Sequence, residues 1–163
     1  MMTRDESLQN LQKALAMELT AAHQYQLHAS VLDDWGMDRL ALKMRQEMQE
    51  ELGHSDSFIA RIMFLKGEPN LSFASPPKMS RTLEAMFATD LADEQEAIKF
   101  YTVASRQAGE AGDIGTRLMF EQIVVDEEGH MAWLELQLDL LKRMGEAVYM
   151  AKHISGPGEV AQP

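Results

Sequence analysis

Apolar residues recur along the chain at alternating steps of three and four, the spacing of an α-helix that buries one face. Four long segments carry such a stripe, and no stretch shows the sustained period-two alternation of a half-buried strand. The sequence therefore predicts an all-α protein. The predicted helices cover about residues 3–34, 38–66, 82–109 and 114–143, with a short fifth helix over residues 146–153.

The connections between these helices differ in length, and the difference predicts the topology. Short turns near Gly36 and at residues 109–113 make the first and second helices, and the third and fourth, antiparallel neighbours. Residues 67–80 contain three prolines and no helical stripe. About 14 extended residues span up to about 46–50 Å, and a helix of about 29 residues is roughly 43 Å long. We therefore expect a four-helix bundle with a long crossover between its second and third helices.

Ligand-type residues interrupt the apolar stripes near the middle of all four long helices. A Glu followed 33 residues later by Glu-x-Gly-His occurs twice, and the copies are offset by 76 residues. Glutamate and histidine three residues apart share one face of a helix. Mid-helix positions also meet at one level of a bundle, so one cluster is expected at the core centre. Its six members are Glu18, Glu51 and His54 from the first copy and Glu94, Glu127 and His130 from the second.

Four buried carboxylates cannot all ionise side by side without compensation, because each isolated buried charge costs several kcal/mol. Either the glutamates share protons or divalent cations neutralise them, and two such ions carry the matching charge. Oxygen and imidazole ligands without thiolates suit iron or manganese, and zinc can occupy such a site. One Glu from each of two helices with Glu-x-x-His from each of the others is the di-iron or di-manganese carboxylate arrangement.

Further polar residues lie close to the predicted cluster. Tyr25 follows Glu18 by two turns on the same stripe, and Tyr101 holds the matching place after Glu94. Tyr25 either hydrogen-bonds a ligand carboxylate and donates an electron, or only packs. Glu47 lies one turn from Glu51 and either supports a ligand from behind or binds metal ions as they enter the site. We expect Glu50 and Glu128 to be solvated or to line an inner surface, and surface or interface roles for His23, His28 and His153.

Composition narrows the classes of function. The 163 residues are most simply one domain over residues 1–153, with a flexible tail over 154–163 that includes Gly156, Pro157, Gly158 and Pro163. A net charge of -11 argues against nucleic-acid and anionic-membrane partners. The absence of cysteine excludes disulfides, thiolate zinc sites and iron–sulfur clusters. The N-terminus lacks the apolar core of a signal peptide, and no apolar run approaches the roughly 20 residues that span a bilayer, so we expect a cytoplasmic protein.

From the first helix to about Lys152 the chain resembles bacterioferritin, within the ferritin-like superfamily. The residues that carry the resemblance are the six predicted ligands, Tyr25, Asp34-Trp35-Gly36, Asp126 to His130, Trp133-Leu134-Glu135 and the Tyr149 region. The resemblance implies iron storage in a shell of 24 subunits. It also implies a ferroxidase centre at which O₂ or H₂O₂ oxidises Fe²⁺. There Glu18 and Glu94 are terminal ligands, Glu51 and Glu127 bridge two irons, and each histidine binds one. A ferredoxin-type protein is the expected reductant for iron release.

One position departs from the family pattern. Bacterioferritins usually bind haem between two subunits through a methionine from each, and the matching residue here is Leu52. The positions expected around that pocket, His23, Gln26 and Gln49, are polar. We therefore expect no haem in a homopolymer. The alternatives are a shell shared with a haem-binding subunit, or a displaced ligand such as Met48 or His23.

Two rival functions remain open from the sequence. The same di-iron site supports O₂ or peroxide chemistry on an organic substrate, or a peroxidase, and fold alone does not decide between them. The small chain, without an evident extra domain or cysteine module, argues against that reading. The second rival is a structural or metal-buffering shell subunit, and the intact set of six ligands argues against a purely structural role.

Overall fold

The computed structural model describes residues 4–160, and this part of the chain contains five helices and no strand. The helices are α1 (Arg4–Asp34), α2 (Asp38–Phe64), α3 (Leu83–Glu110), α4 (Ile114–Met144) and α5 (Glu146–Ala151). The all-α prediction is confirmed, and each end that falls in the described residues lies within two residues of its predicted position. Thr3, the predicted first helical residue, lies outside the described residues.

Local sequence signals account for where the helices begin and end. Gly36, between α1 and α2, has a φ of 80°, a left-handed conformation that glycine adopts without steric cost. The Thr82 side chain accepts a hydrogen bond from the Ala85 amide and caps α3, and Asp113 accepts one from the Thr116 amide and caps α4. These caps satisfy backbone amides that have no partner inside the helix.

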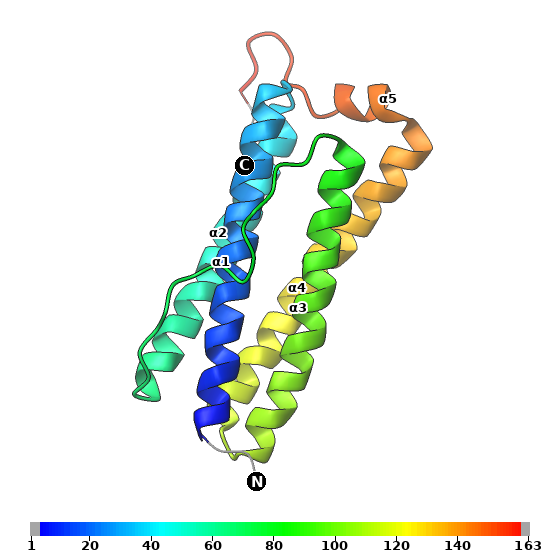
Figure 1. The fold of residues 1–163 in the computed structure, drawn as a ribbon. Coiled ribbons are helices and arrows are strands. Elements are labelled where there is room, and N and C mark those ends of the chain that lie inside the picture. The colour runs from blue at the N-terminus through cyan, green and yellow to red at the C-terminus, as the bar shows by residue number, and fades with distance from the viewer. Residues whose placement is uncertain (1–3, 161–163) are drawn as a thin grey trace.

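The four long helices form two antiparallel pairs, α1 with α2 and α3 with α4 (Figure 1). Residues 65–82 then run back along the bundle to the end where α1 finishes, so the predicted long crossover is confirmed (Figure 1). Polar side chains of α1 hold the crossover along its length by binding its backbone. The pairs are Gln12 with Asn70, Thr20 with Ala74, and Gln24 with Lys78.

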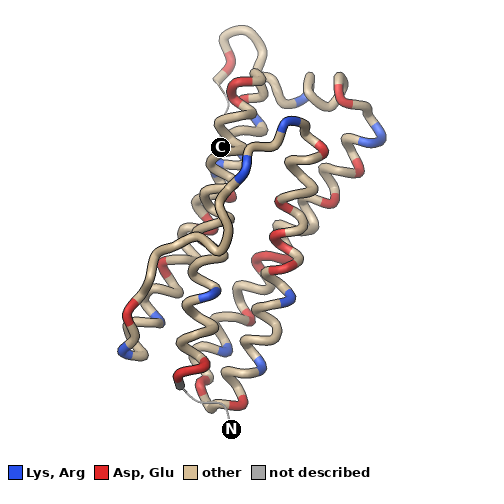
Figure 2. Tube along the Cα trace, in the orientation of Figure 1, with Lys and Arg blue, Asp and Glu red and all other residues tan. Residues whose placement is uncertain are grey.

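The buried apolar residues of the bundle fall into two clusters rather than one. One cluster includes Leu32, Phe87 and Leu134, and the other includes Leu15 and Phe58. Each cluster draws on all four long helices, so the two lie above and below the middle of the bundle. Between them lies a layer of buried glutamate and histidine. Figure 2 shows acidic positions of α3 and α4 gathering at this middle level.

The C-terminal end of the described chain packs on the end of the bundle. Tyr149 of α5 is buried and donates a hydrogen bond to Gln137 of α4, at 2.8 Å. After α5, the Ser155 amide donates to Asp38 at 2.9 Å. The flexibility predicted for residues 154–163 stays a prediction, and residues 161–163 lie outside the described chain. None of the described helices is long and apolar enough to cross a membrane, and the cytoplasmic location also stays a prediction.

Candidate metal centre

The structure brings all six predicted ligand residues together at the middle of the bundle. They form two overlapping groups in which the candidate ligand atoms all lie within 4.8 Å of one another. The first group is Glu18, Glu51, His54 and Glu127, and the second is Glu51, Glu94, Glu127 and His130. Five of the six residues are buried, and His54 is largely so. Glu51 and Glu127 belong to both groups.

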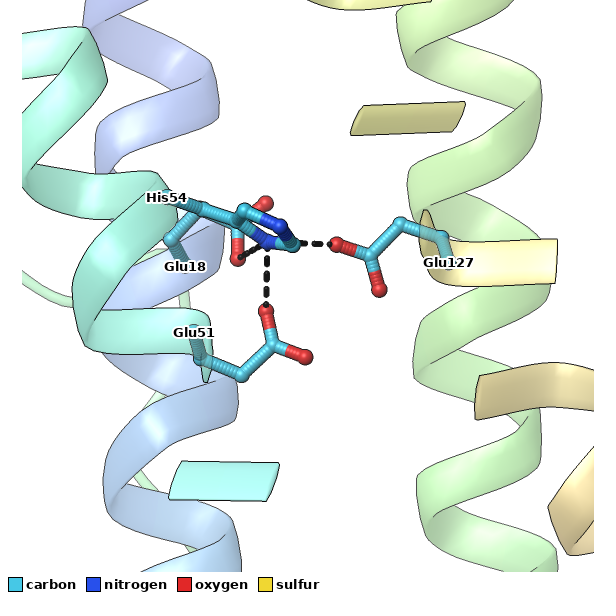
Figure 3. A group of neighbouring side chains, drawn as sticks. All are labelled: Glu18, Glu51, His54 and Glu127. Carbon is cyan, nitrogen blue, oxygen red and sulfur yellow. Dashed lines mark ion pairs between the residues drawn. The ribbon is translucent and has the colours of Figure 1, made fainter. Parts of the chain in front are cut away.

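The first group surrounds one nitrogen of His54 (Figure 3). Its Nδ1 lies 3.0 Å from Glu127 Oε1, 3.4 Å from Glu51 Oε2 and 3.6 Å from Glu18 Oε2. These three carboxylates come from α4, α2 and α1, so three helices meet at one imidazole nitrogen. A cation placed among them would have one nitrogen and several oxygen ligands.

The second group surrounds His130 in the same way. Its Nδ1 lies 2.9 Å from Glu51 Oε1, 3.2 Å from Glu127 Oε2 and 3.5 Å from Glu94 Oε1. Glu51 and Glu127 therefore each turn one oxygen toward His54 and the other toward His130. Glu18 faces only the first group and Glu94 only the second. The arrangement is that of two adjacent cation positions joined by two carboxylates, with one further carboxylate and one imidazole at each.

Two buried tyrosines hold the outer carboxylates across the bundle. Tyr25 donates a hydrogen bond to Glu94 Oε1 at 2.6 Å, and Tyr101 donates one to Glu18 Oε1 at 2.5 Å. The structure thus shows the hydrogen bond to a ligand carboxylate considered for Tyr25, and Tyr101 repeats it. Tyr25 follows Glu18 on α1 but binds Glu94 of α3. Tyr101 follows Glu94 on α3 but binds Glu18 of α1. Electron donation by Tyr25 stays a prediction.

The outer nitrogens of the two histidines also bind acids, which the sequence did not single out as partners. His54 Nε2 lies 3.1 Å from Asp126 Oδ2, and His130 Nε2 lies 2.7 Å from Glu50 Oε2. Glu47 Oε2 lies 3.0 Å from the same His130 nitrogen, which fits the expectation that Glu47 supports a ligand from behind. Glu50 was expected to be solvated or to line an inner surface. Its side chain is exposed, and it also contacts the His130 imidazole.

Proton affinities in the cluster reflect burial and crowding. Burial is the main cause of the raised pKa of the Glu18 and Glu94 carboxyls, and the nearby Glu51 and Glu127 carboxylates raise both further. Burial alone would lower the pKa of His54 and His130, but hydrogen bonds with the surrounding carboxylates raise both well above the ordinary value. All four shifts oppose the build-up of uncompensated negative charge in the cluster.

Several buried atoms in the cluster nevertheless make no hydrogen bond, which is a test of whether a metal fits. Buried polar atoms without a partner are rare in native proteins and call for an explanation such as a bound ion. Four atoms meet no hydrogen-bond geometry, although they lie 2.9–3.6 Å from ion-pair partners within the cluster: Glu18 Oε2, Glu51 Oε1, Glu127 Oε1 and His54 Nδ1. All four belong to the proposed ligand set and turn toward its centre. The residues present therefore fit a pair of divalent cations.

A cavity of about 280 Å³ leads from the cluster to the surface between α1 and α3. Glu18, Glu51, Glu94 and Glu127 line its inner part. Asp90, Asp93 and Glu96 of α3 and Ala74 and Ser75 of the crossover also line it. Acidic side chains along the wall favour a small cation over an anion.

The structure contradicts the expectation for His28. This histidine was expected at the surface or an interface, but it is fully buried. Its Nδ1 lies 2.9 Å from Asp90 Oδ2, and its Nε2 lies 3.2 Å from Ser80 Oγ and 2.9 Å from Gln24 Nε2. The acid partner is 62 residues away along the chain, so no local pattern in the sequence reveals the pair. His23 is partly buried and forms a hydrogen bond with Gln26.

Comparison with known proteins gives a consistent result. A model of the Ferritin-like domain matches residues 8–144. Bacterioferritin from Rhodobacter capsulatus is 43% identical over 135 residues, which cover 83% of this chain and 84% of that protein. Bacterioferritin from Brucella melitensis biotype 1 is 40% identical over 142 residues, covering 87% and 88% respectively.

Solved structures agree with the sequence comparisons. The R. capsulatus bacterioferritin structure, which has a metal-free dinuclear site and a haem iron in a crystallographic special position, matches with a TM-score of 0.93 at 37% identity. That match covers 98% of this chain and all of the other. The Mycobacterium tuberculosis bacterioferritin BfrA structure matches with a TM-score of 0.91 at 34% identity, covering 95% of this chain and 98% of the other.

Proposed function

The chain belongs to the bacterioferritin family of ferritin-like proteins, and from this premise we propose that it is a ferroxidase subunit of an iron-storage shell. Membership of the family supports iron storage. In the proposed reaction, two Fe²⁺ ions bind as substrates at the six-residue cluster and are oxidised to Fe³⁺. The ferric product then collects as mineral inside a shell of 24 subunits.

The observation that carries the proposal is that the two carboxylate oxygens of Glu51, and likewise those of Glu127, face different histidines. Each turns one oxygen toward His54 and the other toward His130. Two metal ions held in this way lie side by side, with Glu18 and His54 completing one position and Glu94 and His130 the other. Four carboxylates neutralise two Fe²⁺ ions. The same hard oxygen ligands hold Fe³⁺ more strongly still, which favours oxidation.

The pairing of two ions suits the electron count of the oxidant. Two Fe²⁺ ions each give one electron, so one O₂ and two protons yield one H₂O₂. When H₂O₂ is the oxidant, the same two electrons and two protons yield two molecules of water. The hydrogen bonds from Tyr25 and Tyr101 keep the two outer carboxylates in place during this change. The acid-lined cavity beside α3 provides a path for Fe²⁺ from solvent.

Anaerobic loading with Fe²⁺ followed by addition of O₂ tests the centre directly. We expect rapid growth of ferric absorbance in the wild type. Glu18→Ala and His130→Ala should slow it strongly, because each removes a ligand from one position. Glu128→Ala is the matched control, since this exposed glutamate adjoins Glu127 without belonging to the cluster. If either ligand variant oxidised iron as fast as the wild type, the proposed centre would be wrong.

Gel filtration with light scattering tests the shell. The subunit mass is 18.4 kDa, and the proposal requires an assembly many times larger. A mass near one subunit or a dimer would exclude storage in a shell. It would then favour a di-iron oxidase or peroxidase that uses the same cluster.

A second candidate function is a haem-less subunit within a mixed shell. Leu52 favours it, because the resemblance to bacterioferritin matches this residue to the haem-ligand methionine, and leucine has no ligating atom. A partner subunit with methionine at that position would supply one haem ligand. Mass spectrometry of the assembly purified from its native cell would show two subunit masses in this case and one in a homopolymer. Release of stored iron needs an electron donor, for which we propose a ferredoxin-type protein.

A further inference from the structure

Each of the two histidines contacts, through its Nε2 atom, an acid that lies on the helix of the other histidine. His54 lies on α2 and contacts Asp126 of α4, whereas His130 lies on α4 and contacts Glu50 of α2. Asp126 directly precedes Glu127, and Glu50 directly precedes Glu51. The residue before each shared glutamate therefore reaches the imidazole of the opposite helix, which ties α2 to α4 on both sides of the centre.

Such contacts decide which nitrogen of a neutral imidazole carries the proton. An acceptor at Nε2 keeps the hydrogen on that nitrogen and leaves the Nδ1 lone pair free. Nδ1 is the atom that faces the shared carboxylates in both histidines, at distances of 2.9–3.4 Å. A carboxylate behind a metal-binding histidine also fixes the ring orientation and makes the other nitrogen a stronger ligand.

The two histidines are not supported equally. Asp126 is the acid partner of His54 Nε2, its side chain is 39% exposed, and the contact is 3.1 Å. His130 Nε2 has two acid partners, Glu50 at 2.7 Å and Glu47 at 3.0 Å. The Glu47 side chain is 1% exposed, so solvent screens its contact with the imidazole far less.

Lys43 explains how an ionised Glu47 is tolerated inside the bundle. Its ammonium group forms a salt bridge with Glu47 Oε1, one turn away on the same helix, and lies 5.1 Å from the centre of the Trp133 ring. This leaves Glu47 Oε2 directed at His130, 3.0 Å from Nε2. The His130 half thus has a buried, charge-balanced acid that the His54 half lacks.

We propose that Asp126, and Glu50 together with Glu47, are positioning residues for the two metal-binding imidazoles, and that the doubly supported His130 half binds a divalent cation more tightly than the His54 half. The inference rests on the proposed function only in taking the six residues as the ligands of two cations. It requires no oxidation of iron. Co²⁺ is a suitable probe, because its visible spectrum reports imidazole and carboxylate ligation and its binding can be measured without O₂ chemistry.

Crystals of the assembled protein exposed to one equivalent of Co²⁺ per subunit test the order of filling through anomalous scattering. We expect the main peak beside His130 Nδ1, with the position beside His54 filling at higher concentration. Equal peaks, or a stronger peak beside His54, would overturn the proposed difference. A peak between Glu47, Glu50 and His130 Nε2 would also overturn the proposal, because those acids would then be ligands rather than positioning residues.

Calorimetric Co²⁺ titration of variants tests the positioning roles. Asp126→Ala should weaken the His54 position by about 10–100-fold, the usual effect of losing such a partner, and leave the His130 position nearly unchanged. Asp126→Asn should recover part of the loss, because its amide oxygen still accepts a hydrogen bond. Glu50→Ala should have a smaller effect on the His130 position, since Glu47 remains. Glu47→Ala with Glu50→Ala should weaken that position as strongly as Asp126→Ala weakens the other.

Glu128→Ala is the matched control for these titrations. It removes an exposed negative charge beside Glu127 without removing a contact to either imidazole. If Glu128→Ala weakened Co²⁺ binding as much as Asp126→Ala, the effect would be one of charge alone and the positioning role would be wrong. Wild-type protein that binds Co²⁺ in the expected order but does not oxidise Fe²⁺ would refute the ferroxidase function and leave this inference standing.

Discussion

At the scale of single residues, the sequence predicts that the six proposed ligands meet, but it does not predict the partner of His28. The ligands occur in a repeat, and each interrupts an apolar stripe, so their residue types and spacing predict that they meet. His28 also lies in a helix and is also buried, but its partner Asp90 is on α3 and follows no spacing rule. A pairing between helices depends on their relative rotation, which a single sequence does not specify.

The buried His28–Asp90 pair gives a stability prediction. His28→Leu leaves Asp90 buried without its partner, and breaking such a pair costs about 3–5 kcal/mol. Replacing both residues by leucine removes the unpartnered acid, so the double variant should lose less stability than His28→Leu alone. Urea denaturation at fixed protein concentration measures the free energy of unfolding of all four proteins. A loss in the double variant equal to the sum of the losses in His28→Leu and Asp90→Leu would show that the pair contributes no coupling.

The acids Asp126 and Glu50 were missed for a related reason. Both are acidic residues on helices of an acidic protein, where a solvated position is the common outcome. The available signal was their identical place in the repeat, one residue before Glu127 and Glu51. That signal becomes meaningful only once the structure shows that each reaches the opposite helix.

At the scale of elements, helix ends were predictable because caps and turn glycines are local signals. The length and proline content of the crossover predicted that it runs along the bundle, although the structure extends it to residues 65–82. Its attachment to α1 was not predictable. Gln12, Thr20 and Gln24 bind its backbone, yet in the sequence they resemble any polar residues on the solvent face of a helix.

Removing one attachment should loosen the crossover locally. Thr20 Oγ1 accepts a hydrogen bond from the Ala74 amide at 2.9 Å, and Ala74 and Ser75 line the cavity above the metal cluster. Thr20→Val keeps the side-chain shape and removes this acceptor, which leaves the Ala74 amide its weaker bond to the Ala16 carbonyl at 3.2 Å, so amide exchange at residues 74–75 should become faster. Gln12→Ala is the matched control, with faster exchange expected only near Asn70. Hydrogen exchange with mass spectrometry reports both, and unchanged exchange at 74–75 in Thr20→Val would contradict the assigned attachment.

At the scale of the whole molecule, the polar layer between two apolar clusters is a compromise between stability and function. The clusters supply the buried apolar area that stabilises the bundle. The layer between them concentrates four glutamates whose charges are tolerated only with protons or metal. Proton uptake and metal binding therefore compete for the same atoms.

This competition sets the direction of the pH dependence. Hydrogen bonds with carboxylates raise the pKa of His54 and His130 despite burial, and burial raises the pKa of Glu18 and Glu94. Protons must leave these groups before a cation binds, so affinity for Zn²⁺ or Co²⁺ should rise as pH increases, with net release of protons. Calorimetry in buffers of different ionisation enthalpy counts the protons released. Affinity that is independent of pH between 5.5 and 7.5, values spanning about two units around the ordinary histidine pKa, would contradict this account.

Leu52 extends the argument from one subunit to the assembly. The resemblance to bacterioferritin implies a haem held between two subunits by a methionine from each, and the leucine at the matching position here has no ligating atom. A homopolymer purified from haem-replete cells should therefore show no Soret band, whereas Leu52→Met should gain one because each subunit of a pair then supplies a thioether. Leu52→Ile is the control for packing and should remain without haem. A Soret band in the wild type would show that another residue, such as Met48 or His23, binds the haem. A Soret band missing from Leu52→Met would instead show that the polar residues His23, Gln26 and Gln49 also exclude haem.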